Sequence, residues 1–522
     1  MSERTQPADS GVAQNTATAT DATATLRRSV YALLILVSTG AMLGRILAVD
    51  AVDKIGLEQY RLDKIDGDLA KKQRTLESQG VSGEALKQQL DQAKGRMLRG
   101  ARLTRPFLSA NDRSRWCTVR AIVEPEMRMP GAPYAIDRVI QEPNWDTIDM
   151  VKHDGHLYSS KPPLMATMMA AVYWPIHRLT GATLATRPYE IGRAMLVLFN
   201  VVPCIVYFVL LASLVERFGT TDWGRIFVMA AACFGTFLTT FAVTINNHVP
   251  AAVCVAATVF MTVRIWFDGE RRLGWFALTG LVTALAVTEE YPAAALAAAV
   301  AIVLLLKAAK PTLLGFLPAA IVVAVAFLGT NWIAHGTLKP AYSMRGGSGP
   351  DNWYNYTYER NGRTVPSYWN EPKGLDRGEP SPKMYAANVL VGHHGLLSLT
   401  PVWLLSLVGL GLWMFRRGDP RIRWSAAAFA GIWGVVIAFY LAWPGVSHNY
   451  GGLTCGFRWL FWLAPLWLLA MLPAADLLAP RRWTRGLALV LLALSVLSAS
   501  YPTWNPWTNP WLMVFSQYLG WH

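Results

Sequence analysis

Repeated apolar runs dominate this sequence of 522 residues and limit the folds open to it. A helix needs about 20 mainly apolar residues to cross the hydrocarbon core of a bilayer, and about eleven segments approach that length. They begin near Ser29, Ala194, Gly224, Val249, Leu273, Ala293, Leu313, Val389, Trp424, Leu460 and Gly486. The runs are continuous and lack the alternation of a membrane β-barrel. We therefore expect an all-α polytopic membrane protein with about eleven spanning helices, whose backbone groups are satisfied within each helix.

The basic residues of the chain indicate its membrane orientation. The formal net charge is +14, but the sequence carries no nucleic-acid-binding motif, and we expect no nucleic-acid partner. Arg and Lys are concentrated in short loops, at Arg217 and Arg225, Arg271 and Arg272, Lys307 and Lys310, Arg416 to Arg423, and Arg481 to Arg485. Two spans separate each of these loops from the next, so all of them can face the cytoplasm, as the positive-inside rule requires.

The N-terminal segment 1–28 is rich in Ala, Thr, Gln and Asp, which predicts a disordered cytoplasmic tail. Arg27 and Arg28 then precede the first span. That span is longer than the apolar core of a signal peptide and has no evident cleavage site. We expect this first span to be an uncleaved signal-anchor. It is the first helix of one polytopic membrane domain that covers 29–522.

One apolar stretch, 162–173, conflicts with this orientation if it crosses the membrane fully, because every later loop would change sides. We therefore expect a half-embedded or interfacial helix on the outer face, anchored by Trp174, His177 and Arg178. The alternative is a true span that is paired with a short span hidden in the hydropathy pattern.

Most of the polar sequence then gathers outside, in the regions 50–193 and 334–388. Within the first region, the charged stretch 54–98 has Leu and Ile at helical spacing and is interrupted at Gly80 and Gly83. This pattern predicts an inserted helical hairpin. Since the cytoplasmic loops hold little besides charge, an active face is expected to point outward.

Asp112 and Arg115 lie in the part of the region 50–193 that is richest in chemically capable side chains, at the start of an amphipathic helix over 112–123. Asp112 has two interpretations. It caps this helix, or it lies at the membrane surface as a general base or as the ligand of a divalent cation. Arg115 is a candidate substrate-binding cation. The five cysteines have no metal-ligand spacing, and we expect no other cofactor.

Lys161 precedes the Pro-Pro pair 162–163, whose rigid geometry starts a helix and holds the lysine above the membrane. A fixed cation at that level suits a lipid-linked phosphate, whereas the alternative is ordinary interfacial snorkelling. Nearby, His153, Asp154 and His156 are either metal ligands or members of a hydrophilic loop, and the second interpretation is favoured.

Three more candidates lie at the ends of spans. Asn247 and His248 stand at the junction of two runs, where they cap helices or donate hydrogen bonds to a sugar. Glu290 follows another carboxylate at a span end, a costly position unless it is hydrated or paired. Glu290 is expected to contact substrate or to pair with Lys161 or Arg458, and the alternative, favoured for at least one of the two glutamates, is ordinary solvation at the interface.

The outer segment 341–388 adds aromatic residues among Asn, Gly and Pro, namely Trp353, Tyr354, Tyr356, Tyr358 and Trp369. Such residues stack on sugars, but they are also enriched at the membrane interface, which we favour here.

The cysteines permit one disulfide. Cys204, Cys233 and Cys254 lie in or beside apolar runs and are expected to pack there. Cys117 and Cys455 lie in regions placed outside, where they can pair if the compartment is oxidising. No spacing selects this pair, so both states stay open.

Three segments together resemble the C-type (GT-C) glycosyltransferase superfamily, which includes protein O-mannosyltransferases and lipid A aminoarabinose transferases. NDRSRWCTVRAIV is similar to the stretch that carries the family's catalytic carboxylate, here Asp112. GHLYSSKPPL resembles its Lys-Pro-Pro element, with Lys161, and GGLTCGFRWLFWLAPL resembles a later glycine-rich segment, with Arg458. The resemblance covers 105–300 best, and the remainder only as alternating spans.

The sequence departs from the family pattern at two points. A long insertion separates Asp112 from the first span, so Asp50 and Asp53, which follow that span directly, compete for its role. Arg113 also stands where the family often has a second acidic residue.

The resemblance implies a glycosyltransferase of the bacterial inner membrane, with its active face in the periplasm. Its donor is a sugar on a polyprenyl phosphate, its acceptor is a lipid, glycan or protein, and the reaction is a single displacement with inversion. Asp112 would activate the acceptor, Lys161 and Arg458 would stabilise the departing phosphate, and Arg115, Asn247, His248 and Glu290 would bind substrate. The alternatives are a lipid or glycan transporter and a non-catalytic membrane scaffold of the same fold.

Overall fold

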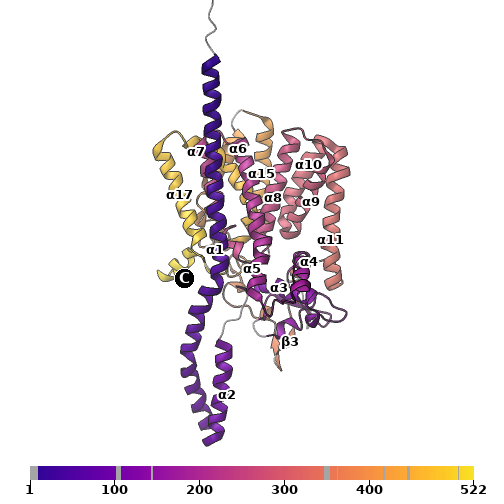
Figure 1. The fold of residues 1–522 in the computed structure, drawn as a ribbon, viewed down its shortest axis with the longest axis vertical. Helices are drawn as coiled ribbons and strands as arrows, with labels where there is room; N and C mark the ends of the chain where they lie inside the picture. The colour runs from indigo at the N-terminus through magenta and orange to yellow at the C-terminus, as the bar shows by residue number, and fades with distance from the viewer. Residues whose placement is uncertain are drawn as a thin grey trace, which may run out of the picture.

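A computed structural model describes residues 10–101, 107–142, 145–345, 353–360, 362–415, 418–443, 447–503 and 505–521, with side chains from 22 onward except 49–61 and 99–101. The chain is 72% helical, and its described strands form two two-stranded antiparallel sheets. A helical bundle occupies one part of the molecule, and a polar layer of loops, short strands and short helices lies at one end of it (Figure 1). The predicted helical fold class is confirmed at this level.

The first two helices form a long arm. Helix α1 (Ser10–Ser78) runs along the bundle and beyond it, and α2 (Gly83–Ala101) folds back on it. The turn contains Gly80 and Gly83, both with positive φ angles that favour glycine. The inserted hairpin predicted over 54–98 is thus present, and it projects from the end of the bundle that carries the polar layer (Figure 1). Helix α1 begins at Ser10, inside the segment 1–28, and residues 1–9 lie outside the described residues. The disorder predicted for this tail stays a prediction.

The bundle contains the apolar helices. They are α5 (Pro188–Leu196), α6 (Val202–Phe218), α7 (Asp222–Phe234), α8 (His248–Trp266), α9 (Leu273–Glu289), α10 (Ala294–Pro311), α11 (Leu317–His335), α14 (Trp403–Phe415), α15 (Pro420–Leu441), α16 (Ala464–Leu478) and α17 (Arg482–Ser500). Within the described chain, seven helical segments are long and apolar enough to cross a membrane, and α9 and α14 are shorter apolar helices. The chain therefore has the character of a multi-pass membrane protein.

The count of about eleven spans is not confirmed, for two reasons that the structure makes visible. Two of the predicted runs, at α10 and α11, join through a kink at Ala308 and a π-turn (Thr312–Phe316) into one continuous segment of 45 residues. Helix α7, with 13 residues, is shorter than a span.

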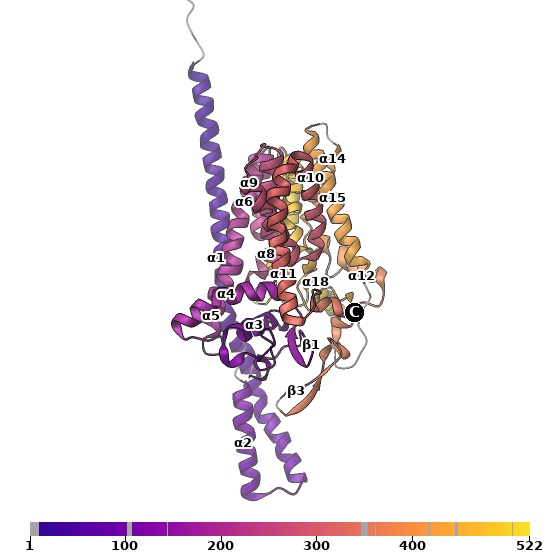
Figure 2. The same cartoon turned by 90° about the vertical axis from the view of Figure 1, so that its right-hand side faces the viewer.

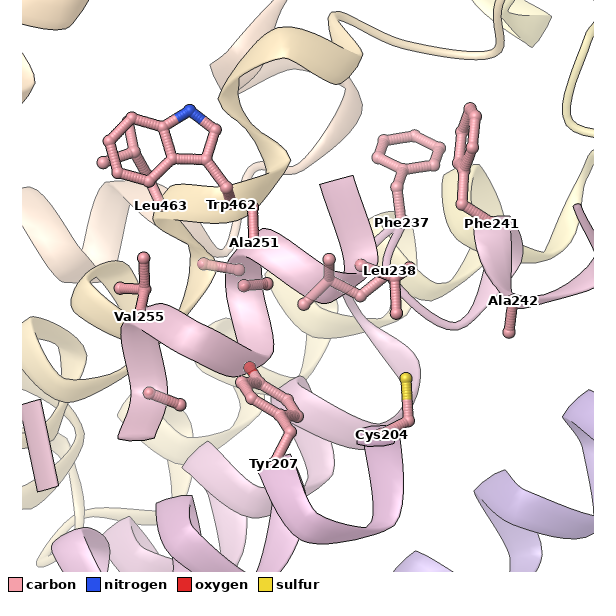
Figure 3. Close-up of a cluster of buried hydrophobic side chains, with 14 of the residues drawn as sticks. Cys204, Tyr207, Phe237, Leu238, Phe241, Ala242, Ala251, Val255, Trp462 and Leu463 are labelled. Carbon is pink, nitrogen blue, oxygen red and sulfur yellow. The ribbon is translucent and has the colours of Figure 1, made fainter. Parts of the chain in front are cut away.

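Helix α16 lies at the centre of the bundle. Its segment Arg458–Leu478 is 83% buried, against 22% for the segment Ala22–Ala48 of α1. Aromatic and aliphatic side chains from α6, α8 and the turn before α16 pack together there (Figure 3). Helix α14 contacts α16 closely at Gly409, where an added Cβ would lie 1.9 Å from the carbonyl oxygen of Ala470.

The basic loops meet at one end of the bundle. Contacts between them are Arg27–Glu216 at 2.5 Å, Arg217–Asp268 at 2.5 Å, Arg421 to the Phe267 carbonyl at 3.4 Å, Lys307 over Trp266 at 5.7 Å, and Arg485 over Trp223 at 5.9 Å. The loops thus share one face, as the spacing of the apolar runs predicts.

The polar layer covers the opposite end. It contains α3 (Ala110–Val123), the hairpin β1 (Met150–His153) and β2 (His156–Ser159), α4 (Pro163–Thr180), the hairpin β3 (Thr357–Arg360) and β4 (Arg363–Pro366), α12 (Pro382–Leu390), α13 (Leu396–Leu399) and α18 (Trp511–Tyr518). Helix α4 lies across the end of the bundle and not along it (Figure 2). It is absent from the seven candidate spans of the described chain, and its Trp174 is 56% exposed. These features favour the predicted interfacial helix over a full span at 162–173.

Candidate functional site

A cavity of 1040 Å³ lies between the bundle and the polar layer. Its polar wall comes from α3, the turn before α4 and the starts of α8 and of the segment after α9. Its apolar wall comes from the end of α15, the segment before α16 and the segment after α17. Principal lining residues are Asn111, Arg115, Asp149, Ser160, Lys161, Asn247, Glu289, Glu290, Tyr354, Trp369, Asp376, Phe439, Tyr440, Trp443, Arg458, Trp459, Trp507 and Met513. Of the seven site residues predicted from the sequence, Arg115, Lys161, Asn247, Glu290 and Arg458 line it.

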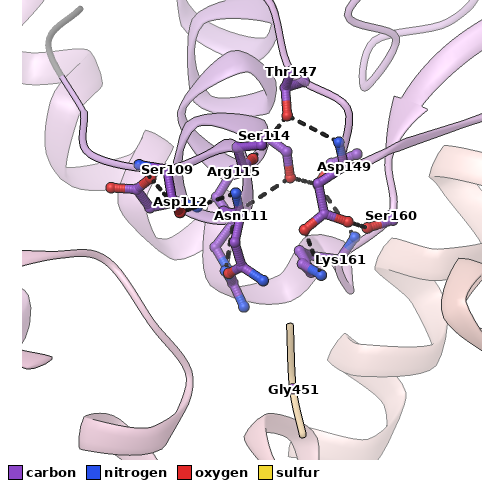
Figure 4. Close-up of polar contacts among 12 residues, drawn as sticks. Ser109, Asn111, Asp112, Ser114, Arg115, Thr147, Asp149, Ser160, Lys161 and Gly451 are labelled. Atoms are coloured by element: carbon purple, nitrogen blue, oxygen red, sulfur yellow. Dashed lines mark hydrogen bonds and ion pairs between the residues drawn. The ribbon is translucent and has the colours of Figure 1, made fainter. Parts of the chain in front are cut away.

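Lys161 forms an ion pair with Asp149 inside the cavity, with Nζ 2.7 Å from Oδ2. The other carboxylate oxygen of Asp149 accepts a hydrogen bond from the Ser160 hydroxyl (Figure 4). Burial would raise the pKa of Asp149, but Lys161 and Ser160 lower it below its ordinary value. Burial lowers the pKa of Lys161 to about 8, although Asp149 opposes the shift. The pair therefore places a lysine with a lowered pKa beside a carboxylate whose pKa is also below its ordinary value.

The sequence did not identify Asp149, although a local signal for it exists. Asp154 and Gly155 form the two-residue loop between β1 and β2, and both have positive φ angles. Asp-Gly between alternating residues is a strong hairpin signal. The register that follows pairs Met150 with Ser159, which brings Asp149 next to Ser160.

Asp112 does not reach the cavity. Its Oδ1 accepts hydrogen bonds from the backbone N–H and the hydroxyl of Ser109, at 2.9 and 3.1 Å, and completes a capping box at the start of α3. Its Oδ2 accepts from Thr244 at 2.7 Å. Thr244 in turn accepts from the indole of Trp507, a cavity residue, so Asp112 lies one layer behind the wall. The geometry supports the capping interpretation of Asp112 over the catalytic one, because Asp112 does not line the cavity and its carboxylate accepts from Ser109 at the start of α3 (Figure 4).

Arg115 begins a hydrogen-bonded chain that runs along the polar wall. Its guanidinium donates to the side-chain oxygens of Asn111 at 2.7 Å and of Asn247 at 3.0 Å. The Asn247 amide then donates to Glu290 at 2.8 Å. Burial lowers the pKa of Arg115, and Glu289 and Asp149 oppose this effect. The chain explains why Asn247 is needed at the start of α8: an amide can accept from a cation and donate to a carboxylate at once.

His248 continues this chain behind the wall. It is fully buried, its Nδ1 contacts Glu290, and its Nε2 lies 2.9 Å from Nη1 of Arg458. A direct pair between Glu290 and Lys161 or Arg458 was one of the predictions, and the structure does not contain it. Glu290 instead contacts Arg458 through the imidazole of His248.

A left-handed loop holds Arg458 from the other side. Tyr450, Gly451 and Gly452 have φ angles of 59°, 90° and 78°. This conformation turns the Gly451 carbonyl toward Arg458, whose Nε and Nη2 donate to it at 3.0 and 2.8 Å. The consecutive glycines of the segment that resembles the family's glycine-rich element are therefore a backbone requirement.

Aromatic side chains form the apolar wall. Tyr440 stacks on Trp459 with ring centroids 5.1 Å apart, and the Arg458 guanidinium lies 5.1 Å from the Trp507 ring. Of the five aromatic residues predicted to stack on sugars or to mark the interface, Tyr354 and Trp369 line the cavity. The others do not: Trp353 stacks on His153, Tyr356 donates to the Met150 carbonyl, and Tyr358 lies in β3.

The metal and disulfide candidates have other partners. His156 contacts Asp137 at 3.3 Å, and the described residues include no group of three or more His, Cys, Asp or Glu side chains placed to hold a metal ion. Cys117 and Cys455 are both free thiols, and Cys117 donates to the Trp145 carbonyl. The competing carboxylates at positions 50 and 53 lie outside the described side chains.

Comparisons with protein-family models, with curated proteins and with solved structures find no match to this chain.

Proposed function

We propose that this protein is a membrane glycosyltransferase that moves a sugar from a polyprenyl phosphate to an acceptor hydroxyl. The observation that carries the proposal is the convergence of two buried cations, Arg115 and Arg458, and the partly buried Lys161 with the carboxylate of Asp149 in one cavity at the end of an apolar bundle. The resemblance of three sequence segments to the GT-C superfamily supports the same reaction class.

The cations are suited to a phosphate. Burial disfavours the charged forms of Lys161 and Arg115, so an anion in the cavity is stabilised by both and stabilises them in return. Charge on a phosphate group increases as its bond to the sugar breaks, and fixed cations in a water-poor site stabilise that change.

The apolar wall is suited to a lipid chain. Phe439 lines the cavity while its side chain is 44% exposed, so the cavity wall continues onto the apolar surface of the bundle. Trp443 and Trp459 extend this wall. A polyprenyl chain can then lie against α15 with its phosphate at the cations.

In the proposed reaction, an acceptor hydroxyl attacks the anomeric carbon of the donor. The bond between that carbon and the phosphate oxygen breaks, and polyprenyl phosphate leaves with the bonding electrons. Asp149 accepts the hydroxyl proton, the role that the sequence suggested for Asp112, because its carboxylate lines the cavity beside Lys161. Lys161 and Arg458 stabilise the leaving group.

The positive-inside rule gives the proposed orientation. With the basic loops in the cytoplasm, the cavity at the opposite end opens on the outer side, which is the periplasm if the membrane is a bacterial inner membrane. The donor would then enter from the outer leaflet.

Transfer of labelled sugar from polyprenyl-phosphate donors by the purified protein tests the proposal. Asp149→Asn should lower the transfer rate by about 100-fold or more, because the base is lost. The matched control is Asp112→Asn, which removes a carboxylate outside the cavity and should keep most of the rate in the protein that remains folded. Equal rates for wild type and Asp149→Asn would remove Asp149 from the mechanism, and binding of polyprenyl phosphate without transfer by wild type would favour the non-catalytic scaffold.

A further inference from the structure

His248 is isolated from the cavity and yet tied to two residues that line it. Its ring is fully buried, and the rings of Phe241 and Phe461 lie 6.1 and 6.2 Å from it. Its two nitrogens contact Glu290 and Arg458. It therefore acts on a ligand in the cavity only through its neighbours.

The proton position on His248 follows from the chemistry of its partners. Arginine has N–H donors and no acceptor, so Nε2 of His248 must accept the bond from Nη1 of Arg458 at 2.9 Å. A neutral imidazole carries its single proton on the other nitrogen, so Nδ1 donates to the Glu290 carboxylate. The result is a directional chain from the guanidinium through the imidazole to a carboxylate.

This chain determines how Arg458 presents its remaining donors. Two of its five N–H groups go to the Gly451 carbonyl and one goes to His248, which leaves two for the cavity. Gly451 and His248 hold the guanidinium at different atoms, and the Trp507 ring lies 5.1 Å from it. Donors fixed in this way need no reorganisation when charge develops on a ligand.

We propose that His248 is a positioning residue that, together with Glu290, orients the Arg458 guanidinium toward the phosphate of the lipid substrate. The inference rests on the proposed function, because it assumes that a phosphate occupies the cavity. It goes beyond that function because it gives His248 a role through Arg458. The sequence had left two other roles open for His248, a hydrogen bond to the sugar and a helix cap.

Two isosteric substitutions separate this role from simple packing. In His248→Gln, the amide oxygen can take the position of Nε2 and still accept from Arg458. In His248→Asn, the amide nitrogen takes the position of Nδ1 and donates to Glu290, but the acceptor for Arg458 is lost. Binding of farnesyl phosphate and of farnesol is measured by calorimetry in detergent micelles, so that the difference reports recognition of the phosphate.

Wild type should bind farnesyl phosphate more tightly than farnesol. His248→Asn should lose about tenfold in affinity for farnesyl phosphate, as expected for a bond to a charged group, and His248→Gln should stay within about threefold of wild type. Farnesol affinity should not change. In the Arg458→Gln background, His248→Asn should have no further effect, since the two residues act as a unit.

Equal losses in the Asn and Gln variants, or additive losses with Arg458→Gln, would overturn the positioning role while leaving the proposed function intact. A wild type that binds farnesyl phosphate and farnesol equally would overturn the proposed function, and this inference with it. If His248→Asn does not fold, Glu290→Gln takes its place. It weakens the far end of the chain and should lower phosphate affinity, and unchanged affinity there would also contradict the proposal.

Discussion

At the scale of single residues, ionisable side chains in the cavity change one another's pKa values. Partial burial of Lys161 disfavours its charged form, and the Asp149 carboxylate at 2.7 Å opposes this effect. Arg115 and Arg458 have no such direct carboxylate partner among the described side chains. Arg115 donates to Asn111 and Asn247, and Arg458 donates to His248 and the Gly451 carbonyl. A phosphate in the cavity would therefore be the first anion in direct contact with either guanidinium.

The lowered pKa of Lys161 predicts that the proposed phosphate binding depends on pH. Lys161 is charged below its pKa of about 8 and neutral above it, so affinity for farnesyl phosphate should fall as the pH rises through 8. The phosphate itself stays a dianion there, because its second pKa is about 6. Calorimetric titrations between pH 7 and 9.5 measure this. In Lys161→Arg the fall should vanish, because arginine stays protonated, and the same fall in both proteins would show that another group is responsible.

The residues that the sequence predicted and missed differ in one physical respect. Lys161 and Arg458 stand next to a proline pair and a glycine pair, and these local signals determine where the chain turns. Asp112 stands in a helix first turn, where a carboxylate serves as a cap or faces a ligand, and only the position of Thr244, distant in sequence, decides between the two. The position of Asp149 in the cavity could be predicted only from the register of the β1–β2 hairpin, which places Asp149 beside Ser160.

At the scale of elements, local sequence patterns predicted individual helices and turns better than hydropathy predicted the number of membrane spans. The glycine-interrupted hairpin of α1 and α2, the helix α3 and the crosswise helix α4 all follow from spacing, caps and prolines. The number of spans did not, because apolar runs of similar composition form a 13-residue helix in one place and one joined segment in another. Tertiary contacts between helices, and not hydropathy, decide these lengths.

The contact between α14 and α16 offers a test at this scale. Gly409→Ala should destabilise the protein by about 1–3 kcal/mol, since its Cβ would overlap the Ala470 carbonyl and force the helices apart. Gly411→Ala in the same helix is the matched control, because its Cβ meets nothing within 4 Å. Thermal unfolding in detergent should give a lower Tm for the first variant alone. Equal melting temperatures would mean that the two helices are not packed as closely as described.

At the scale of the whole molecule, charge divides the chain between two ends. The basic loops meet where α6, α8 and α17 begin or end, and their cations pair with acidic and aromatic neighbours. The cavity cations lie at the opposite end, where they line a space of 1040 Å³. Both groups are basic, and the second lines a cavity with room for a ligand, which is why we propose that a lipid phosphate binds there and not among the basic loops.

The location of a bound lipid phosphate tests this central claim most directly. A structure of the purified protein with undecaprenyl phosphate should show the phosphate in the cavity, within about 3 Å of Lys161 Nζ and of an Arg458 guanidinium nitrogen. The isoprenoid chain should lie against Phe439 and Trp443. A phosphate bound instead among the basic loops at the other end, near Arg217 or Arg421, would contradict the account.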